Sequence, residues 1–259
     1  EIHDHVLNFQ LSNDFQVRKV LTNYHPADKE SHSYASLLEW RNIYYEPKEK
    51  KVIGKEKSIV RLGIVQWQMR PANLENLLSQ VEYFTDTISS YNADFLLLPE
   101  FFNMPLMGQY NKLSTGDAIR QLAQFTEEIR EKILEYAISY NINIIAGSMP
   151  VHENGNLYNV SYLCRRDGTW DEQYKLHPTP SEVQDYGMQG GHTLQVFDTD
   201  VGKVGILICY DIEFPELARL LAAQGVKILF VPYLTDTPNS FHRVKLCAQA
   251  RAIENECYV

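Results

Sequence analysis

VGILICYDIEFPE, residues 204–216, combines a short apolar run, one cysteine and the start of a helix. The run at residues 204–208 is continuous and rich in β-branched side chains, a pattern typical of a strand that is covered on both faces. Pro215 suits the first position of a helix, and the apolar stripe that follows it ends at Gly225. Cys209 is therefore predicted to lie in a strand-to-helix turn, where helix amide dipoles favour the thiolate.

The composition is that of a globular protein with one main core. The 259 residues are 44% hydrophobic, and no apolar run approaches the length needed to cross a bilayer. A formal net charge of -9 without a basic cluster argues against a nucleic-acid partner. The four cysteines include no CxxC pair and no secretory signal precedes them, so the expected location is the reducing cytoplasm.

The two ends of the sequence predict a longer natural polypeptide. The chain begins at Glu1 without a methionine, and it stops inside an expected strand at residues 256–259. Such an unpaired strand would leave an exposed sheet edge. We therefore expect the natural chain to extend past both ends.

Residues 1–57 differ in character from the rest and are interpreted as an N-terminal extension with a lysine-rich linker at 47–51. Two strands are expected around an Asn-Asp turn, at 9–12 and 15–20, with a third segment at 34–40. His3 and His5 form an HxH pair, but a frayed polar terminus explains it better than a metal site.

Residues 15–40 resemble the last strands of a GNAT acetyltransferase, in which a hairpin precedes an acidic loop and a final strand. The acetyl-CoA loop of that family is absent here, and an idiosyncratic extension is the alternative. The resemblance implies a remnant of a preceding acetyltransferase domain.

From residue 58 onward, strands and helices alternate along the chain, which predicts stacked layers with largely parallel pairing in the sheet. The expected strands are 59–66, 95–100, 142–147, 157–164, 169–174, 193–197, 204–208 and 227–231, and the expected helices are 73–91, 115–140, 215–224 and 240–255. A hairpin is expected around Asp167-Gly168, a dipeptide that a type I′ turn prefers.

Glu100, Lys175 and Cys209 each follow the C-terminal end of an expected strand, so a cleft at those ends would gather them. Singly, Glu100 could cap a helix, Lys175 could be a solvated hairpin lysine, and Cys209 could be a small buried hydrophobe. Together they suit one reaction. A carboxylate takes the thiol proton, the thiolate attacks a carbonyl or nitrile carbon, and an ammonium stabilises the resulting oxyanion.

These residues lie in motifs that resemble those of the carbon-nitrogen hydrolase, or nitrilase, superfamily, over about residues 58–259 and in the correct order. The motifs are LLPE at 97–100, YKLH at 174–177, GILICYD at 205–211 with FPE at 214–216, and ARAIEN at 250–255. The resemblance implies an αββα sandwich. The usual family domain continues past residue 259, so the C-terminal part is expected to be missing from this chain.

By the same resemblance, Cys209 is the nucleophile, and Glu100 is the general base and later the general acid. Lys175 stabilises the oxyanion with the backbone amide of Tyr210, and Glu182 is the candidate that orients Lys175. The implied reaction is attack of Cys209 on an amide, release of ammonia or an amine, and hydrolysis of a thioester. Neither a metal nor an organic cofactor is implied.

The expected substrate is a small linear amide or an N-carbamoyl compound, and a homodimer or higher homo-oligomer is the expected assembly. Three alternatives stay open. The chain could hydrolyse a nitrile, transfer the acyl group to an amine, or be a catalytically silent binding or regulatory module fused to an acetyltransferase.

Overall fold

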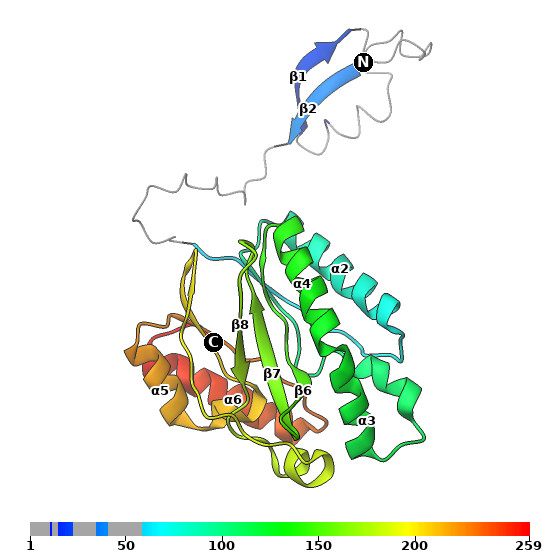
Figure 1. Ribbon diagram of the computed structural model, residues 1–259. Coiled ribbons are helices and arrows are strands. Elements are labelled where there is room, and N and C mark those ends of the chain that lie inside the picture. Colours follow the sequence, from blue (N-terminus) through cyan, green and yellow to red (C-terminus); the bar gives the residue numbers. More distant parts are fainter. Residues whose placement is uncertain (1–10, 12–14, 23–34, 41–58) are drawn as a thin grey trace. The chain divides into compact units, whose positions relative to one another are not determined.

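The computed structural model describes residue 11 and residues 15–22, 35–40 and 59–259 (Figure 1). The chain divides into two compact units, Glu1–Lys55 and Glu56–Val259. In the first unit, β1 (Phe15–Leu21) pairs antiparallel with β2 (Ala35–Trp40). This hairpin is consistent with many folds and does not assign the unit to the acetyltransferases.

Parts of the N-terminal predictions lie outside the described residues. These are the HxH pair, the lysine-rich linker and most of the strand expected at 9–12. Leu11, the one described residue of that strand, is helical rather than extended.

The second unit contains two sheets. The first has the order β3-β4-β5-β7-β6, with β8 on the other edge of β7. Its strands are β3 (Leu62–Ile64), β4 (Phe95–Leu97), β5 (Asn143–Ile145), β6 (Met149–Glu153), β7 (Asn156–Cys164) and β8 (Trp170–Tyr174). The pairs β3-β4 and β4-β5 are parallel, whereas β7 pairs antiparallel with β5, β6 and β8.

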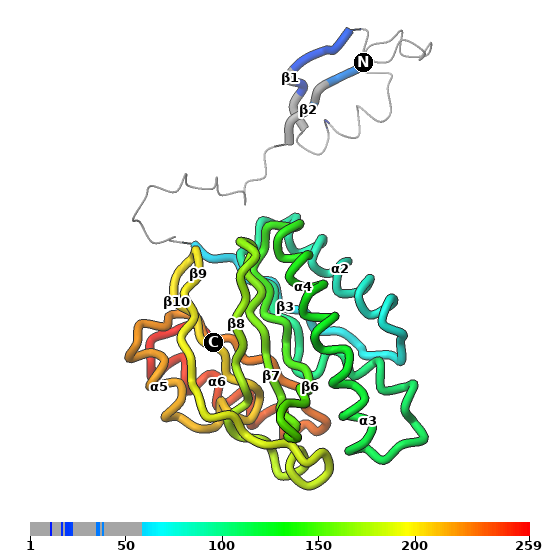
Figure 2. The backbone as a smooth tube through the Cα atoms, viewed as in Figure 1, coloured from blue at the N-terminus to red at the C-terminus, as the bar shows by residue number. Residues whose placement is uncertain are grey.

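The second sheet is smaller and carries the segment with the cysteine. It has the order β11-β10-β9, with β9 (Phe197–Thr199), β10 (Gly202–Ile206) and β11 (Ile228–Phe230). The backbone trace runs from β9 through a turn into β10 and then onward to α5 (Pro215–Ala223) (Figure 2). β10 is antiparallel to β9 and parallel to β11, as expected for strands joined by a turn and by a helix.

The helices cover the outer faces of both sheets, so the layers follow the order αββα (Figure 1). α2 (Leu74–Ser90) and α4 (Thr126–Ser139) share one apolar core with Leu96 of β4. The preceding residue of the strand, Phe95, belongs to the other core, which includes residues of α5 and α6 (Pro238–Asn255). The rings of Phe95 and Phe230 lie 5.0 Å apart between the two sheets. The predicted αββα sandwich is confirmed.

One predicted helix is divided in the structure. In place of a single helix at 115–140, α3 (Thr115–Leu122) passes into a 3-10 turn at Ala123–Phe125 and then into α4. The hydroxyl of Thr126 donates to the backbone oxygen of Pro150 on β6 at 2.7 Å. This buried contact ties the start of α4 to the sheet. The spacing of the apolar residues does not predict it, because the contact is a hydrogen bond to a strand that is distant in sequence.

The hairpin between β7 and β8 uses another turn than expected. Of its two central residues only Gly168 has a positive φ, +89°, whereas a type I′ turn needs two such residues. The Gly168 N–H donates to Arg165 O at 3.1 Å, and Arg165 N–H donates to Thr169 O at 2.8 Å. The longer turn leaves the predicted strands in place.

Two strand predictions also change. β6 was not expected, and β9 begins at Phe197 rather than at residue 193. The side chain of Gln173 hydrogen-bonds to Thr193 O at 2.8 Å and to Gln195 N at 3.0 Å. A side chain therefore satisfies the backbone where a neighbouring strand was predicted. Across the described ranges, no helix is long and apolar enough to cross a membrane.

Candidate active site

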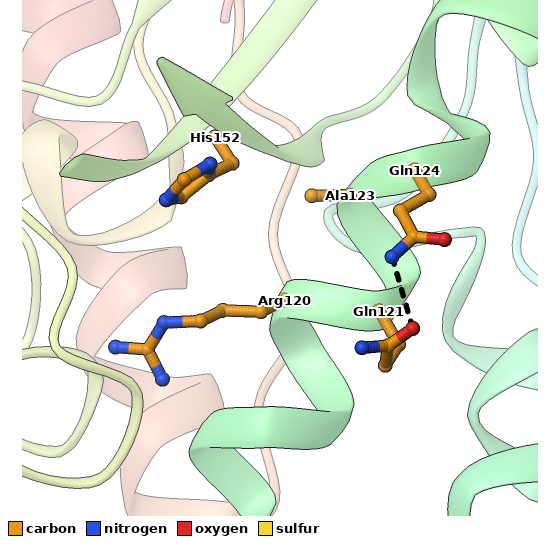
Figure 3. Close-up of a pocket in the computed structure, with 5 residues that line it drawn as sticks. All are labelled: Arg120, Gln121, Ala123, Gln124 and His152. Carbon is orange, nitrogen blue, oxygen red and sulfur yellow. Dashed lines mark hydrogen bonds between the residues drawn. The ribbon is translucent and has the colours of Figure 1, made fainter. Parts of the chain in front are cut away.

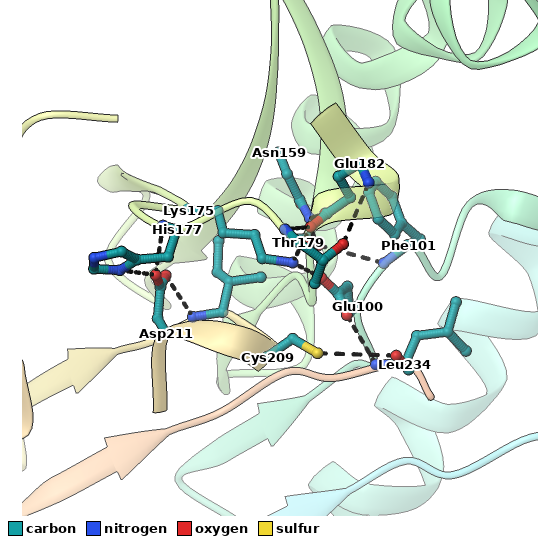
Figure 4. Close-up of polar contacts among 12 residues, drawn as sticks. Glu100, Phe101, Asn159, Lys175, His177, Thr179, Glu182, Cys209, Asp211 and Leu234 are labelled. Atoms are coloured by element: carbon teal, nitrogen blue, oxygen red, sulfur yellow. Dashed lines mark hydrogen bonds and ion pairs between the residues drawn. The ribbon is translucent and has the colours of Figure 1, made fainter. Parts of the chain in front are cut away.

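Glu100, Lys175 and Cys209 come together at the C-terminal ends of three strands (Figure 4). Glu100 follows β4 by three residues, Lys175 follows β8 directly, and Cys209 follows β10 by three residues. Lys175 Nζ lies 2.9 Å from Glu100 Oε1. Leu234, in the loop after β11, contacts both Glu100 and Cys209. Its N–H donates to Glu100 Oε2 at 2.9 Å, and its carbonyl oxygen lies 3.8 Å from Cys209 Sγ. The structure thus brings Glu100 and Lys175 into contact and places Cys209 on the same loop residue that binds Glu100.

The backbone at Cys209 is a sharp, strained turn. Cys209 has a φ of +48°, which is uncommon for a residue with a side chain and occurs often at functional sites. Its N–H donates to Pro232 O at 2.9 Å. The chain then continues as a 3-10 turn over Cys209–Glu213, and α5 begins only at Pro215. Tyr210 is the second residue of this turn, and the first N–H groups of a helical turn have no partner within it.

Lys175 is held between two carboxylates and is only 1% exposed. Its Nζ donates to Glu100 and, at 2.6 Å, to Glu182 Oε2. Burial by itself lowers the pKa of Lys175, but the charges of Glu100 and Glu182 outweigh burial and raise it above its ordinary value. Lys175 is therefore an ammonium ion throughout the neutral range.

Glu182 lies where the sequence expected a member of the site. It begins a single helical turn at Glu182–Tyr186, and it is buried. Besides the bond to Lys175, its Oε2 accepts from the Thr179 N–H at 2.6 Å. The loop after β8 thus folds back and places a second carboxylate on the ammonium.

Glu100 is buried, and burial raises the pKa of its carboxyl above the ordinary value of 4.5. The Lys175 charge opposes this rise, and the Glu182 charge adds to it. A carboxyl with a raised pKa is a better proton acceptor than an ordinary glutamate while it is ionised.

The prediction that the cysteine meets a thiolate-favouring environment is wrong for this geometry. Burial raises the pKa of Cys209 above its ordinary 9.0, and the negative charge of Glu100 raises it further, with Lys175 opposing both. The 3-10 turn separates Cys209 from the start of α5, so no long helix dipole acts on the sulfur. The resting group is a thiol that needs a base.

Sequence reasoning missed Asn159 as a member of the site. Its Nδ2 donates to Glu100 Oε1 and to Glu182 Oε1, each at 3.0 Å. Asn159 lies on β7, most of which is buried on both faces. A polar residue in such a strand needs an internal partner, and that requirement was the available clue.

Asp211, the last residue of the GILICYD motif, connects two segments of the site. Its carboxylate accepts from the N–H groups of Leu176, His177 and Ile208, at 3.1, 2.8 and 3.3 Å. It therefore ties the segment after Lys175 to the turn that carries Cys209. Burial raises the pKa of Asp211, and the hydrogen bonds from Leu176 and His177 oppose this.

Arg251 of α6 supports the far side of the same turn. Its guanidinium donates to Ile212 O and Glu213 O, both at 3.1 Å, and the residue is buried. The ARAIEN segment quoted from the sequence thus packs on the turn that carries Cys209.

Two cavities lie outside the polar cluster. One of about 380 Å³, lined by Arg120, Gln121, Ala123, Gln124 and His152, contains none of the predicted site residues (Figure 3). The other, of about 360 Å³, has a largely apolar wall that includes Pro99 and Leu234, next to Glu100.

Comparisons with known proteins agree with this fold. The chain is similar to an amidase from Nesterenkonia sp., with a TM-score of 0.65, 23% identity, and coverage of 76% of this chain and 73% of that one. It is also similar to Saccharomyces cerevisiae Nit3, a member of branch 10 of the nitrilase superfamily, with a TM-score of 0.62, 24% identity, and coverage of 76% and 73%.

Sequence comparisons place the same region in one family. The chain is 44% identical over 259 residues to the probable hydrolase YhcX of Bacillus subtilis (strain 168). The match covers 100% of this chain but only 50% of that protein, so this chain spans about half the length of that relative. It is 29% identical over 211 residues to omega-amidase NIT2 of Xenopus tropicalis, which covers 77% of this chain and 72% of that protein. Residues 61–259 match the family model described as carbon-nitrogen hydrolase. The chain therefore belongs to the carbon-nitrogen hydrolase family.

Proposed function

We propose that this protein hydrolyses the C–N bond of a small linear amide or an N-carbamoyl compound through a thioester on Cys209. The observation that carries the proposal is the buried pair of Glu100 and Lys175, 2.9 Å apart, beside a cysteine in a strained turn. Similarity to omega-amidase NIT2 supports an amide as the substrate class.

The first half of the reaction forms the thioester. Glu100 accepts the proton of the Cys209 thiol as Sγ attacks the amide carbon, and the C=O electron pair moves to oxygen. The Lys175 ammonium and the Tyr210 N–H stabilise this oxyanion. When the intermediate collapses, the C–N bond breaks and Glu100 gives its proton to the leaving nitrogen, so ammonia or an amine departs.

The second half releases the acid. Glu100 accepts a proton from water while the water oxygen attacks the thioester carbon, and the C–S bond then breaks. The proton held by Glu100 returns to the sulfur, which restores the starting enzyme. Glu182 takes no part in proton transfer in this scheme and holds the Lys175 ammonium through the 2.6 Å contact.

The test is to trap the acyl-enzyme. Wild type, Glu100→Gln and Lys175→Ala are incubated with a panel of ω-amides, N-carbamoyl amines and nitriles, quenched in acid, and the peptide with Cys209 is weighed. An adduct in wild type alone supports the scheme, and its mass identifies the acyl group. An adduct of equal yield in all three proteins refutes the assigned roles.

The same panel separates the alternatives. A nitrile as the only substrate identifies a nitrile hydrolase, and transfer of the acyl group to added hydroxylamine in preference to water identifies an acyl transferase. Binding in calorimetry without turnover or adduct identifies a silent module. The contact of Glu100 with Lys175, and the contacts of Leu234 with both Glu100 and Cys209, disfavour the last outcome.

A further inference from the structure

Asn159 contacts both carboxylates of the site through one side-chain nitrogen (Figure 4). We propose that Asn159 is a positioning residue, which holds Glu100 and Glu182 together and keeps Glu100 in the ionised form that accepts the Cys209 proton. This inference rests on the proposed function and adds a residue that the quoted motifs do not contain.

The contacts form a closed ring of two acceptors and two donors. Lys175 Nζ donates to Glu100 and Glu182, at 2.9 and 2.6 Å, and Asn159 Nδ2 donates to the same two residues at 3.0 Å. One ammonium balances only one of the two carboxylate charges. The amide has two N–H groups and no charge, so it stabilises the second carboxylate without adding another ion.

The orientation of the amide follows from the same contacts. A reversed amide would place its oxygen against two carboxylates, which is repulsive, whereas the nitrogen donates to both. Within the described residues, the Asn159 Oδ1 atom has no partner. The backbone oxygen of Asn159 accepts from Lys175 N at 2.8 Å. The main chain of Asn159 thus holds the backbone at Lys175, while its side chain holds the two carboxylates.

Loss of the amide should change the ionisation of Glu100 more than the fold. Glu100 faces the Lys175 ammonium from the end of β8, the Glu182 carboxylate from the following loop, and the Cys209 thiol from the end of β10. Among the described residues, the N–H of Leu234 also donates to Glu100, at 2.9 Å. Without the Asn159 N–H, the ionised carboxylate loses one donor and keeps the repulsion of Glu182, so its pKa rises.

The experiment compares the pH dependence of three proteins, wild type, Asn159→Leu and Ser161→Ala. Leucine is close to asparagine in size and donates no hydrogen bond. Ser161 is the matched control, because it lies two residues along the same strand, is buried, and has a hydroxyl without a partner in the described part of the chain. The readouts are kcat/KM with an amide substrate and the rate of Cys209 alkylation by iodoacetamide, followed on the Cys209 peptide.

For Asn159→Leu we expect the acid limb of both profiles to move upward by about one pH unit, with kcat on the plateau lower by about 10- to 100-fold. Ser161→Ala should leave the limb in place. An unchanged limb in Asn159→Leu, or an equal shift in Ser161→Ala, overturns the inference. If Asn159→Leu does not fold, Asn159→Ser has one hydroxyl donor for two carboxylates and should shift the limb in the same direction.

The two readouts separate this inference from the proposed function. If wild type neither turns over nor acylates with any panel member, the proposed function fails, while alkylation still measures the coupling of Asn159 to the Cys209 site. If wild type is active and the Asn159→Leu profiles match it, only the positioning role fails.

Discussion

Two carboxyl groups, one ammonium and one thiol share a buried space in this protein. Glu100, Lys175, Glu182 and Cys209 are all buried, so their charges interact strongly and each sets the protonation of the others. Burial raises the pKa values of Glu100 and Cys209, and the neighbouring carboxylates raise that of Lys175 against the effect of burial. The resting state is thus a Lys175 ammonium ion and a Cys209 thiol beside Glu100, which accepts a proton only when it is ionised.

This arrangement predicts the pH dependence of the reaction. Glu100 must be ionised to act as a base, so kcat/KM falls as pH falls through its pKa, and that pKa lies above 4.5. No basic limb is expected up to about pH 9, because the pKa of Cys209 lies above 9.0 and that of Lys175 above 10.5. Initial rates from pH 4 to pH 10 test this, with circular dichroism at each pH as the control for unfolding. An acid limb at or below pH 4.5 contradicts it.

Cys209→Ala should abolish turnover and leave the fold intact. The substitution removes the attacking atom and trims a small side chain, so we expect a loss on the order of 10³-fold or more in kcat. Cys164→Ala is the matched control, since Cys164 is also buried and lies at the end of β7, where its Sγ contacts Arg130 O. Turnover and thermal unfolding are measured for both variants. Retention of more than about a tenth of wild-type activity in Cys209→Ala would show that Cys209 is structural.

At the scale of elements, the site depends on where strands end and how the following backbone bends. β5 and β6 both pair with the same edge of β7, and the chain bends between them at Gly147. Gly147 has a φ of +45°, and a Cβ there would overlap the carbonyl oxygen of Pro99. The bend thus packs against the backbone that carries Glu100.

Gly147→Ala should therefore destabilise the protein by about 3 kcal/mol or more, because a left-handed backbone and a backbone clash combine. Gly155→Ala is the matched control. Gly155 also has a positive φ, +81°, but a Cβ there has no neighbour within 4 Å, so only the conformational cost of about 1 kcal/mol is expected. Urea unfolding of the two variants and of wild type measures the difference. Equal decreases in the free energy of unfolding would show that the backbone at Pro99 moves away from the added Cβ without destabilising the protein.

At the scale of the whole molecule, the contacts of the site found among the described residues lie in the unit Glu56–Val259. The hydrogen-bond partners found for Glu100, Lys175, Glu182 and Cys209 belong to residues 100–234. Both apolar cores also lie in residues 59–259.

We accordingly expect the segment Glu56–Val259, prepared alone, to keep the rate of Cys209 acylation or alkylation within about threefold of that of the 259-residue chain. The measurement is the rate of acylation or alkylation of Cys209 in the two proteins, with thermal unfolding as the check on folding. A well-folded segment with a strongly reduced rate would show that residues 1–55 contribute to the site.

Much of the fold was predictable because burial imposes regular spacing on the sequence. α2 was expected at 73–91 and is found at Leu74–Ser90, since its apolar residues recur every three or four positions. The positions of Glu100, Lys175 and Cys209 were predictable for a related reason, because each follows a strand that the sequence pattern predicts. Local sequence therefore determined which residues stand at the strand ends.

Tertiary structure alone decided how those residues affect one another. The division of residues 115–140 occurs where Thr126 contacts Pro150, which lies 24 residues further along the chain. The role of Asn159 depends on Glu100, 59 residues earlier, and on Glu182 in a later loop. The thiol character of Cys209 follows from burial and from the charge of Glu100, neither of which its own neighbours in sequence encode. Spacing along a chain records local burial, whereas hydrogen bonds and charge coupling depend on distances in space, which arise only when distant segments pack together.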